Sequence, residues 1–185
     1  MSLLKVSILV FVVSFAGITA KADSILWKGI LDQPKYNVFF LRHALAPGYG
    51  DPTDFNIDNC KSQRNLNSEG RDQAASIGTD LKSIGISFDK IYSSEWCRCT
   101  ETASLLNLGE VTTFSGLNSF FQDHYNREKT LAKLMNKLES LDKTGRVLMV
   151  THQVVISAVT GIDVSSGVAV AYNPSDGSAV KLSMR

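Results

Sequence analysis

Val38-Phe39-Phe40-Leu41-Arg42-His43 is the stretch of this 185-residue sequence that decides the fold. Four consecutive apolar residues followed by two polar ones are typical of a short strand that is buried on both faces and carries polar side chains at its carboxyl end. Far along the chain, Val147-Leu148-Met149-Val150-Thr151-His152 repeats this arrangement. Open α/β sheets bind ligands at the carboxyl ends of their strands. We therefore expect both strands in one parallel sheet, with His43 and His152 at the same edge.

The segments around these two strands alternate between helical and strand patterns, as in α/β proteins. Asn67 is a suitable N-cap for a helix that ends before Gly85. Another helix, predicted over 128–141, is amphipathic, and we expect its apolar face to lie in the core. The sequence thus predicts an α/β fold with a mostly parallel sheet, in which residues 44–64 form a long loop. The apolar face of the helix over 128–141 consists of Leu131, Leu134, Met135 and Leu138. The other expected elements are strands over 90–93 and 111–114, a helix over 96–106, a helix that follows His152 and runs to about residue 160, and a terminal hairpin of 168–172 with 179–183.

The N-terminus has the three parts of a secretory signal peptide. Lys5 precedes an apolar run over 6–18, and Ala20-Lys21-Ala22 provides a small-x-small cleavage site. The run is shorter than the roughly 20 apolar residues of a membrane-spanning helix, so we expect no membrane span after cleavage. The sequence therefore predicts a signal peptide over residues 1–22 and a single domain over residues 23–185, exported to the periplasm or secreted.

Charge and cysteine content bear on partners and compartment. The 19 Lys and Arg residues nearly balance the 18 Asp and Glu residues, so no nucleic-acid partner is expected. All three cysteines follow the predicted signal peptide, and an oxidising compartment would allow a disulfide. Cys97 and Cys99 would point to opposite sides of a helix and cannot easily pair with each other. We expect Cys60 to pair with Cys97 or with Cys99, which would tie the long loop to the helix over 96–106.

Two of the three histidines, His43 and His152, directly follow predicted buried strands. A single histidine in such a place is usually a satisfied structural residue, but two at one sheet edge with arginines nearby point to a shared anion site. Arg42 adjoins the first strand, and Arg98 lies in the first turns of a helix, where free backbone N–H groups also favour an anion. Guanidinium groups bind phosphate oxygens by charge-assisted hydrogen bonds. The alternative for each arginine is a surface ion pair.

Four motifs around these residues resemble the signature of the histidine phosphatase superfamily. They occur in the family's order and span roughly Tyr36 to Gly161. The motifs are Leu41-Arg42-His43-Ala44, similar to Arg-His-Gly; Leu66-Asn67-Ser68-Glu69-Gly70 with Gln73-Ala74, similar to Leu-Thr-x-x-Gly-x-x-Gln-Ala; Ser94-Glu95-Trp96-Cys97-Arg98 with Thr102-Ala103, matching Ser-x-x-x-Arg-x-x-x-Thr-Ala; and Thr151-His152, similar to the second Ser/Thr-His.

This resemblance implies a phosphoglycerate mutase-like fold, a three-layer α/β/α sandwich, in a small exported branch of the superfamily. It also implies a phosphatase that hydrolyses phosphate monoesters or phosphoramidates through a phosphohistidine intermediate on His43. Arg42, Arg98 and His152 would bind the phosphoryl group and stabilise its charge in the transition state. No metal and no other cofactor would be required. The expected partner is a small phosphorylated substrate, or a phosphorylated protein or glycan.

The sequence departs from this family in two places. Position 44 is Ala where most members have Gly, and no carboxylate occupies the place of the glutamate that donates a proton to the leaving group in the mutase-like branch. Asp123 is the first candidate to replace that glutamate, ahead of Asp51 and Asp54 in the long loop; the alternative for each is a solvated loop acid. Without a proton donor, only good leaving groups would be released well. The alternative function is therefore a non-catalytic phosphate-binding protein of the same fold, and the sequence does not indicate an oligomeric state.

Overall fold

The computed structural model describes residues 26–183, and the expected signal peptide over 1–22 lies outside them. A six-stranded sheet in the order β3-β2-β4-β1-β5-β6 forms the middle of the domain. Its first four strands along the chain pair in parallel, whereas β5 runs antiparallel to β1 and to β6. The prediction of a mostly parallel sheet is confirmed. The strands are β1 (Val38–Arg42), β2 (Lys90–Ser93), β3 (Val111–Thr113), β4 (Val147–Thr151), β5 (Ala169–Tyr172) and β6 (Ala179–Leu182).

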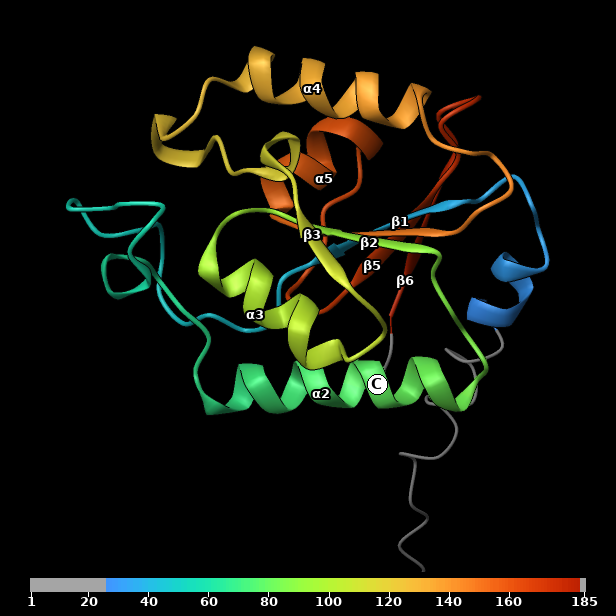
Figure 1. The fold of residues 1–185 in the computed structure, drawn as a ribbon, viewed down its shortest axis with the longest axis horizontal. Helices are drawn as coiled ribbons and strands as arrows, with labels where there is room; N and C mark the ends of the chain where they lie inside the picture. Colours follow the sequence, from blue (N-terminus) through green and yellow to red (C-terminus); the bar gives the residue numbers. More distant parts are fainter. Residues whose placement is uncertain (1–25, 184–185) are drawn as a thin grey trace, which may run out of the picture.

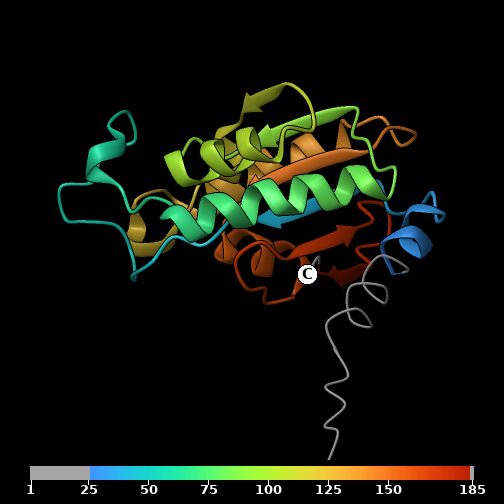
Figure 2. The ribbon, with the colours of Figure 1, turned by 90° about the horizontal axis from the view of Figure 1, so that it is seen from below.

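Helices cover both faces of the sheet, as Figures 1 and 2 show. Successive side chains of a strand point to opposite faces, so β1 contributes Phe39 and Leu41 to the core under α2 and α3, and Val38 and Phe40 to the core under α4 and α5. A strand buried on both faces needs apolar residues throughout, which explains the continuous run in the sequence. The result is the expected three-layer α/β/α sandwich. The helices are α2 (Ser68–Ser83), α3 (Cys97–Leu106), α4 (Arg127–Glu139) and α5 (Gln153–Thr160).

Helix α2 begins and ends where the sequence predicts. The side chain of Asn67 accepts a hydrogen bond from the backbone N–H of Gly70 at 2.8 Å, and Gly85 follows the helix with a φ of 79°. Gly78 lets α2 approach α3 closely, because a Cβ atom there would lie 2.0 Å from the backbone oxygen of Leu106. This close packing fixes the position of α3, which carries Arg98.

The structure differs from the sequence-based expectation at two helices. Residues 26–31 form a helix that the sequence analysis did not expect, and Trp27 is buried from it. On α4, Leu134 and Leu138 are buried, but Met135 is 39% exposed. The buried residues of α4 follow one another at intervals of four, starting with Thr130. The helix therefore buries a narrower stripe than its apolar residues cover, and the expectation that Met135 belongs to the core was wrong.

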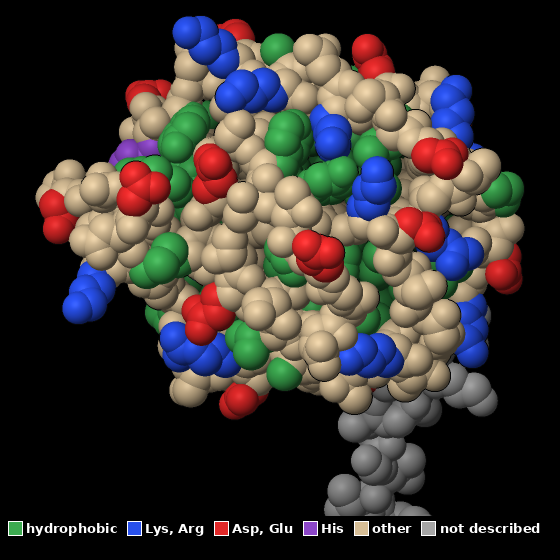
Figure 3. All heavy atoms as spheres, viewed as in Figure 1, with side chains coloured by type: hydrophobic (Ala, Val, Ile, Leu, Met, Phe, Trp, Pro, Cys, Tyr) green, Lys and Arg blue, Asp and Glu red, His purple; other side chains and the backbone are tan. Residues whose placement is uncertain are grey.

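The surface is mixed in charge on the face shown in Figure 3, where Lys and Arg side chains are interspersed with Asp and Glu. Between residues 26 and 183, no helix has the length and hydrophobicity needed to cross a membrane.

The loop over 44–67, which contains the 3₁₀ helix η1 (Cys60–Ser62), projects at one end of the molecule in Figures 1 and 2. The segment between β3 and α4 reaches the same end and contains η2 (Ser115–Leu117) and η3 (Phe121–Asp123).

Candidate active site

The two histidines meet at the carboxyl edge of the sheet. β1 and β4 pair in parallel with Arg42 opposite Thr151, so the residues that follow, His43 and His152, leave the sheet side by side. Their ring centroids lie 5.5 Å apart. Arg98, in the first turn of α3, reaches the same place and completes one cluster. A cavity of about 460 Å³ opens on it, lined by Arg42, His43, Leu45, Ala46, Pro47, Gly48, Tyr49, Gly50, Arg64, Arg98, Ser119, Phe121, His152, Gln153, Val154 and Ser166.

His43 has one nitrogen available for chemistry, and the hydrogen bonds identify it. Nδ1 lies 2.8 Å from the backbone oxygen of Ala44, so Nδ1 carries the proton and donates it. Nε2 then holds the lone pair, and it accepts a hydrogen bond from Nε of Arg98 at 3.2 Å. Burial, and next the positive charge of Arg98, lower the pKa of His43 to about 3. The imidazole is therefore neutral at physiological pH, with the lone pair of Nε2 facing the arginine.

His152 is also kept neutral and is held by a chain of hydrogen bonds. Burial, followed by the charge of Arg98, lowers its pKa well below the usual value. Nη2 of Arg98 lies 3.4 Å from Nδ1, so Nδ1 is the acceptor and the opposite nitrogen, Nε2, donates to Oγ of Ser94 at 2.9 Å. Ser94 in turn donates to the side-chain oxygen of Asn118 at 3.2 Å. This chain fixes the tautomer and the plane of the ring.

The guanidinium of Arg98 is buried and fully hydrogen-bonded. Nη1 donates to Oδ1 of Asp51 at 2.7 Å and Nη2 donates to Oδ2 at 3.1 Å, with side chains only 3% and 4% exposed for the arginine and the aspartate. Nη1 also donates to the backbone oxygen of Arg64 at 3.2 Å. With the contacts to the two histidines, the guanidinium of Arg98 has protein partners on every side.

Two further arginines border the cavity and retain donors for an anion. Nη1 of Arg42 donates to the backbone oxygen of Val164 at 2.7 Å, but its Nε is buried without a partner among the described residues. Arg64 donates to backbone oxygens of its own loop, at Gly50 and Ala46. Sequence reasoning missed Arg64, for which the only signal was its place two residues before the motif that begins at Leu66.

None of the three candidate proton donors lines the cavity. Asp123 is exposed in η3 and is not among the residues that line the cavity. Asp54 is exposed in the long loop. Asp51 is close to the cluster, but both of its oxygens are bound to Arg98. Thus the structure brings His43, His152, Arg42 and Arg98 together as the motifs suggested, and it places no carboxylate among the residues lining this cavity.

The cysteines divide into a bonded pair and a buried thiol. Cys60 and Cys97 form a disulfide that joins the long loop to the start of α3, one of the two pairings that the sequence left open. Cys99 is free and buried, with its sulfur 3.5 Å from Nε2 of His152. Burial raises the pKa of the Cys99 thiol to about 12, so it is protonated and packs as a small apolar group.

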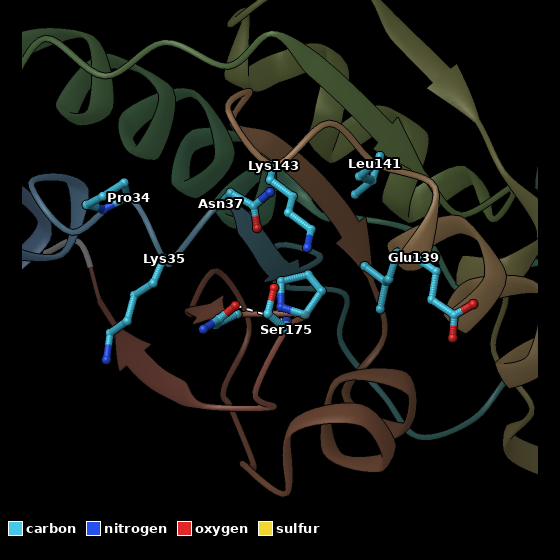
Figure 4. Close-up of a pocket in the computed structure, with 10 residues that line it drawn as sticks. Pro34, Lys35, Asn37, Glu139, Leu141, Lys143 and Ser175 are labelled. Atoms are coloured by element: carbon cyan, nitrogen blue, oxygen red, sulfur yellow. Dashed lines mark hydrogen bonds between the residues drawn. The ribbon is translucent and has the colours of Figure 1, made fainter.

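A second cavity, of about 380 Å³, lies at the opposite, amino edge of the parallel strands. Figure 4 shows Lys35, Glu139 and Lys143 around it; Lys35 lies before β1, Glu139 is the last residue of α4, and Lys143 lies between α4 and β4. All three residues are exposed. Nowhere in residues 26–183 do three or more His, Cys, Asp or Glu side chains gather as a metal site would require. The buried, catalytically capable groups are therefore those at the carboxyl edge.

The fold and this cluster define an α/β protein with a pocket lined by two neutral histidines and three arginines at the carboxyl edge of its sheet. Residues 38–130, half of the chain, match the family model of the histidine phosphatase superfamily, branch 1. The protein belongs to this superfamily, whose members are generally phosphatases. A search of curated proteins by sequence finds no match.

Solved structures show the same fold at low sequence identity. The protein histidine phosphatase SixA in complex with tungstate superimposes with a TM-score of 0.54 at 15% identity, covering 78% of this chain and 92% of that one. TTHB049 from Thermus thermophilus gives a TM-score of 0.56 at 19% identity, with 80% and 99% covered. Rv3214 from Mycobacterium tuberculosis gives 0.53 at 14% identity, with 80% and 95% covered. At these identities the likeness establishes the architecture alone.

Proposed function

We propose that this protein is an exported phosphatase that hydrolyses phosphate monoesters or phosphoramidates through a phosphohistidine on His43. The observation that carries the proposal is the lone pair of Nε2 of His43, held neutral and facing a pocket that contains Arg42, Arg64 and Arg98. A neutral imidazole is a nucleophile, and the arginines favour the negative charge of a phosphoryl group. The two requirements of covalent phosphoryl transfer are thus met in one buried place.

The reaction proceeds in two displacements. Nε2 of His43 forms a bond to phosphorus while the bond from phosphorus to the leaving oxygen or nitrogen breaks, and the leaving group departs with that electron pair. Water then attacks phosphorus, the N–P bond breaks, and Nε2 regains its lone pair as inorganic phosphate leaves with the oxygen of the water. The guanidinium groups hold the equatorial oxygens through both steps, and a hydrogen bond from His152 to one of these oxygens requires a proton on its Nδ1.

The cavity favours good leaving groups over simple alkoxides. No carboxylate lines it, so no carboxylic acid is placed to protonate a strongly basic leaving oxygen. Tyr49 and Phe121 meet edge to face at its rim with ring centroids 5.2 Å apart, which offers an apolar surface to a planar leaving group. Aryl phosphates and phosphohistidine combine a planar ring with an acceptable leaving group. The description of SixA as a protein histidine phosphatase supports including phosphorylated proteins in the substrate class.

Export is part of the proposal. The signal-peptide pattern over residues 1–22 and the disulfide between Cys60 and Cys97 support it, because structural disulfides persist mainly in oxidising compartments. Cell fractionation followed by N-terminal sequencing is expected to recover a chain that begins at Asp23 outside the cytoplasm. Recovery of the uncleaved chain in the cytoplasm, with free thiols, contradicts this part of the proposal.

Hydrolysis of an aryl phosphate and of phosphoimidazole by the wild type and by His43→Ala tests the enzymatic proposal. We expect turnover by the wild type, none above background by the variant, and a phosphoenzyme trapped by an alkaline quench, which preserves N–P bonds. The lack of a carboxylate at the cavity favours one other candidate, a phosphate-binding protein without turnover. Tight phosphate binding by the wild type with no hydrolysis and no trapped phosphohistidine establishes that alternative instead.

A further inference from the structure

We propose that Asp51 is a positioning residue that acts through Arg98, holding its guanidinium so that one chosen edge faces the transferring phosphoryl group. The proposal rests on the phosphoryl chemistry proposed for the same cavity. On this proposal the carboxylate of Asp51 aligns Arg98 and does not donate a proton to the leaving group.

The pairing between the two side chains is end-on. Asp51 accepts from Nη1 with one oxygen and from Nη2 with the other, at 2.7 and 3.1 Å. A guanidinium is planar and carries its five donors in a fixed fork, so an end-on carboxylate leaves the edge made by Nε and Nη2. That edge points at Nε2 of His43 and Nδ1 of His152, at 3.2 and 3.4 Å. A phosphoryl group that reaches Nε2 of His43 would take the place of these two histidine contacts on this edge of Arg98.

Asp51 is itself held in place on both oxygens. The backbone N–H of Arg64 donates to Oδ1 at 3.0 Å and the indole N–H of Trp96 donates to Oδ2 at 3.1 Å. The backbone N–H of Asp51 donates to the side chain of Gln122 at 2.7 Å. With the two bonds from Arg98, each carboxylate oxygen has two donors. Such a carboxylate has one orientation, and it transmits that orientation to the arginine.

The same contacts make Asp51 a poor acid. Burial raises its pKa, but hydrogen bonds from Arg98, the charge of Arg98 and the donors on Arg64 and Trp96 outweigh burial and lower the pKa below its usual value. An ionised carboxylate has no proton to give a leaving group. Its negative charge instead offsets the mutual repulsion of Arg98 with Arg42 and Arg64, each of which has its pKa lowered by burial and by the charge of Arg98.

The disulfide places this pair on one structural unit. Cys97 precedes Arg98 and is bonded to Cys60, in the loop that carries Asp51. The backbone N–H of Cys97 also donates to the side chain of Gln63 at 2.9 Å. The loop over 44–67 and the first turn of α3 are therefore tied together at two points beside the arginine that they orient.

A double-mutant cycle on anion binding tests the proposal with Asp51→Asn, Arg98→Ala and the double variant. The readout is the ratio of the dissociation constants for phosphate and for vanadate, measured by calorimetry, since vanadate can adopt the five-coordinate geometry of the transition state and phosphate resembles the ground state. A partly unfolded sample changes the amount of binding protein and leaves this ratio unaltered. Binding needs no turnover, so the cycle remains informative even where the protein does not hydrolyse phosphate esters.

We expect Asp51→Asn to lower the preference for vanadate about tenfold, and to have no further effect once Arg98 is already Ala. The exposed Asp54→Asn in the same loop is the matched control, with a wild-type ratio. Trp96→Phe removes one donor to Asp51 and is expected to give a smaller shift in the same direction, which serves where Asp51→Asn does not fold. An unchanged ratio in Asp51→Asn, or an equal loss in the Arg98→Ala background, overturns the proposal.

Discussion

The two edges of the parallel strands are both hollowed, but they differ in where their charges lie. At the carboxyl edge, His43, Arg98 and His152 are each no more than 3% exposed. At the amino edge, the charged residues around the smaller cavity, such as Lys35 and Lys143, are exposed. Burying an ionisable group costs several kcal/mol unless it is paired or neutralised, so a cluster of such groups marks a site that the fold was built to hold. The cavity at the amino edge is bordered by solvated charges, which have no such desolvation cost.

Removal of a charged side chain should reveal the largest difference in catalytic activity between the two edges. Arg98→Ala is expected to lower kcat/KM for an aryl phosphate on the order of a thousandfold, because it removes donors aimed at the transferring phosphoryl group and leaves Asp51 unpaired. Lys143→Ala at the amino edge should stay within about twofold of wild type, as expected for an exposed charge. Steady-state kinetics at saturating and limiting substrate measure both variants. Similar losses in the two variants contradict the assignment of the site.

Removal of the disulfide should loosen the carboxyl edge alone. The bond closes a loop between residues 37 positions apart, so replacing Cys60 and Cys97 with Ser is expected to lower the free energy of unfolding by about 3–4 kcal/mol. Urea denaturation measures the loss, and hydrogen exchange should rise over 44–67 and stay unchanged over 138–146. Reductant should reproduce the effect in the wild type and do nothing to the double variant. Faster exchange spread over both edges contradicts the prediction.

The buried histidines should make the protein less stable in acid. His43 and His152 have folded pKa values below the 6.5 of an unfolded histidine. Below pH 6.5 the unfolded chain therefore binds protons that the folded chain refuses, and stability falls as the pH falls. Between pH 6.5 and 5 the expected loss from His43, whose folded pKa is about 3, is about 2 kcal/mol, from roughly 1.4 kcal/mol per pH unit, and His152 adds a loss of the same sign. Asp51 titrates in the unfolded chain near 3.8 and does not contribute in this window.

Urea unfolding at pH 7, 6 and 5 measures this dependence. His152→Asn, which cannot gain a proton, should have a shallower slope than the wild type. Unfolding free energies that do not change over this range would show that neither buried histidine resists protonation.

Substitution of the aromatic pair at the rim of the cavity, Tyr49 and Phe121, should have the smallest effect on the kinetics. Tyr49 is 87% exposed and contacts Phe121 edge to face, so its contribution is limited to one face of a planar leaving group, worth about 1 kcal/mol. Tyr49→Ala is expected to raise KM for an aryl phosphate about fivefold and to leave KM for a small, non-aromatic phosphoramidate unchanged. Equal changes for the two substrates would assign Tyr49 to the phosphoryl side of the cavity.

Much of the architecture of the carboxyl edge could be predicted from the sequence, because it depends on local patterns. The apolar runs that end at His43 and His152 predict buried parallel strands, and the carboxyl ends of parallel strands lie at one edge of a sheet, which places both histidines there. The Asn67 cap and Gly85 delimit α2 for reasons that involve only neighbouring residues. The helix over 26–31 was missed because its stability depends on burying Trp27 against the sheet, and no local pattern indicates it.

Only the tertiary structure decided what the charged loop residues do. Asp51, Arg64 and Asp123 all lie in irregular segments, where no periodicity indicates direction, and the sequence ranked Asp123 first as the proton donor. The fold leaves Asp123 in solvent, turns Arg64 to the cavity and pairs Asp51 with Arg98. The sequence by itself predicted a mostly parallel sheet, because strand ends follow from the hydrophobic pattern, and the motifs that resemble the family predicted that Arg42, His43, Arg98 and His152 come together. The pairing of Asp51 with Arg98 is a contact between residues far apart in the chain, and its geometry depends on the packing of the whole loop against α3.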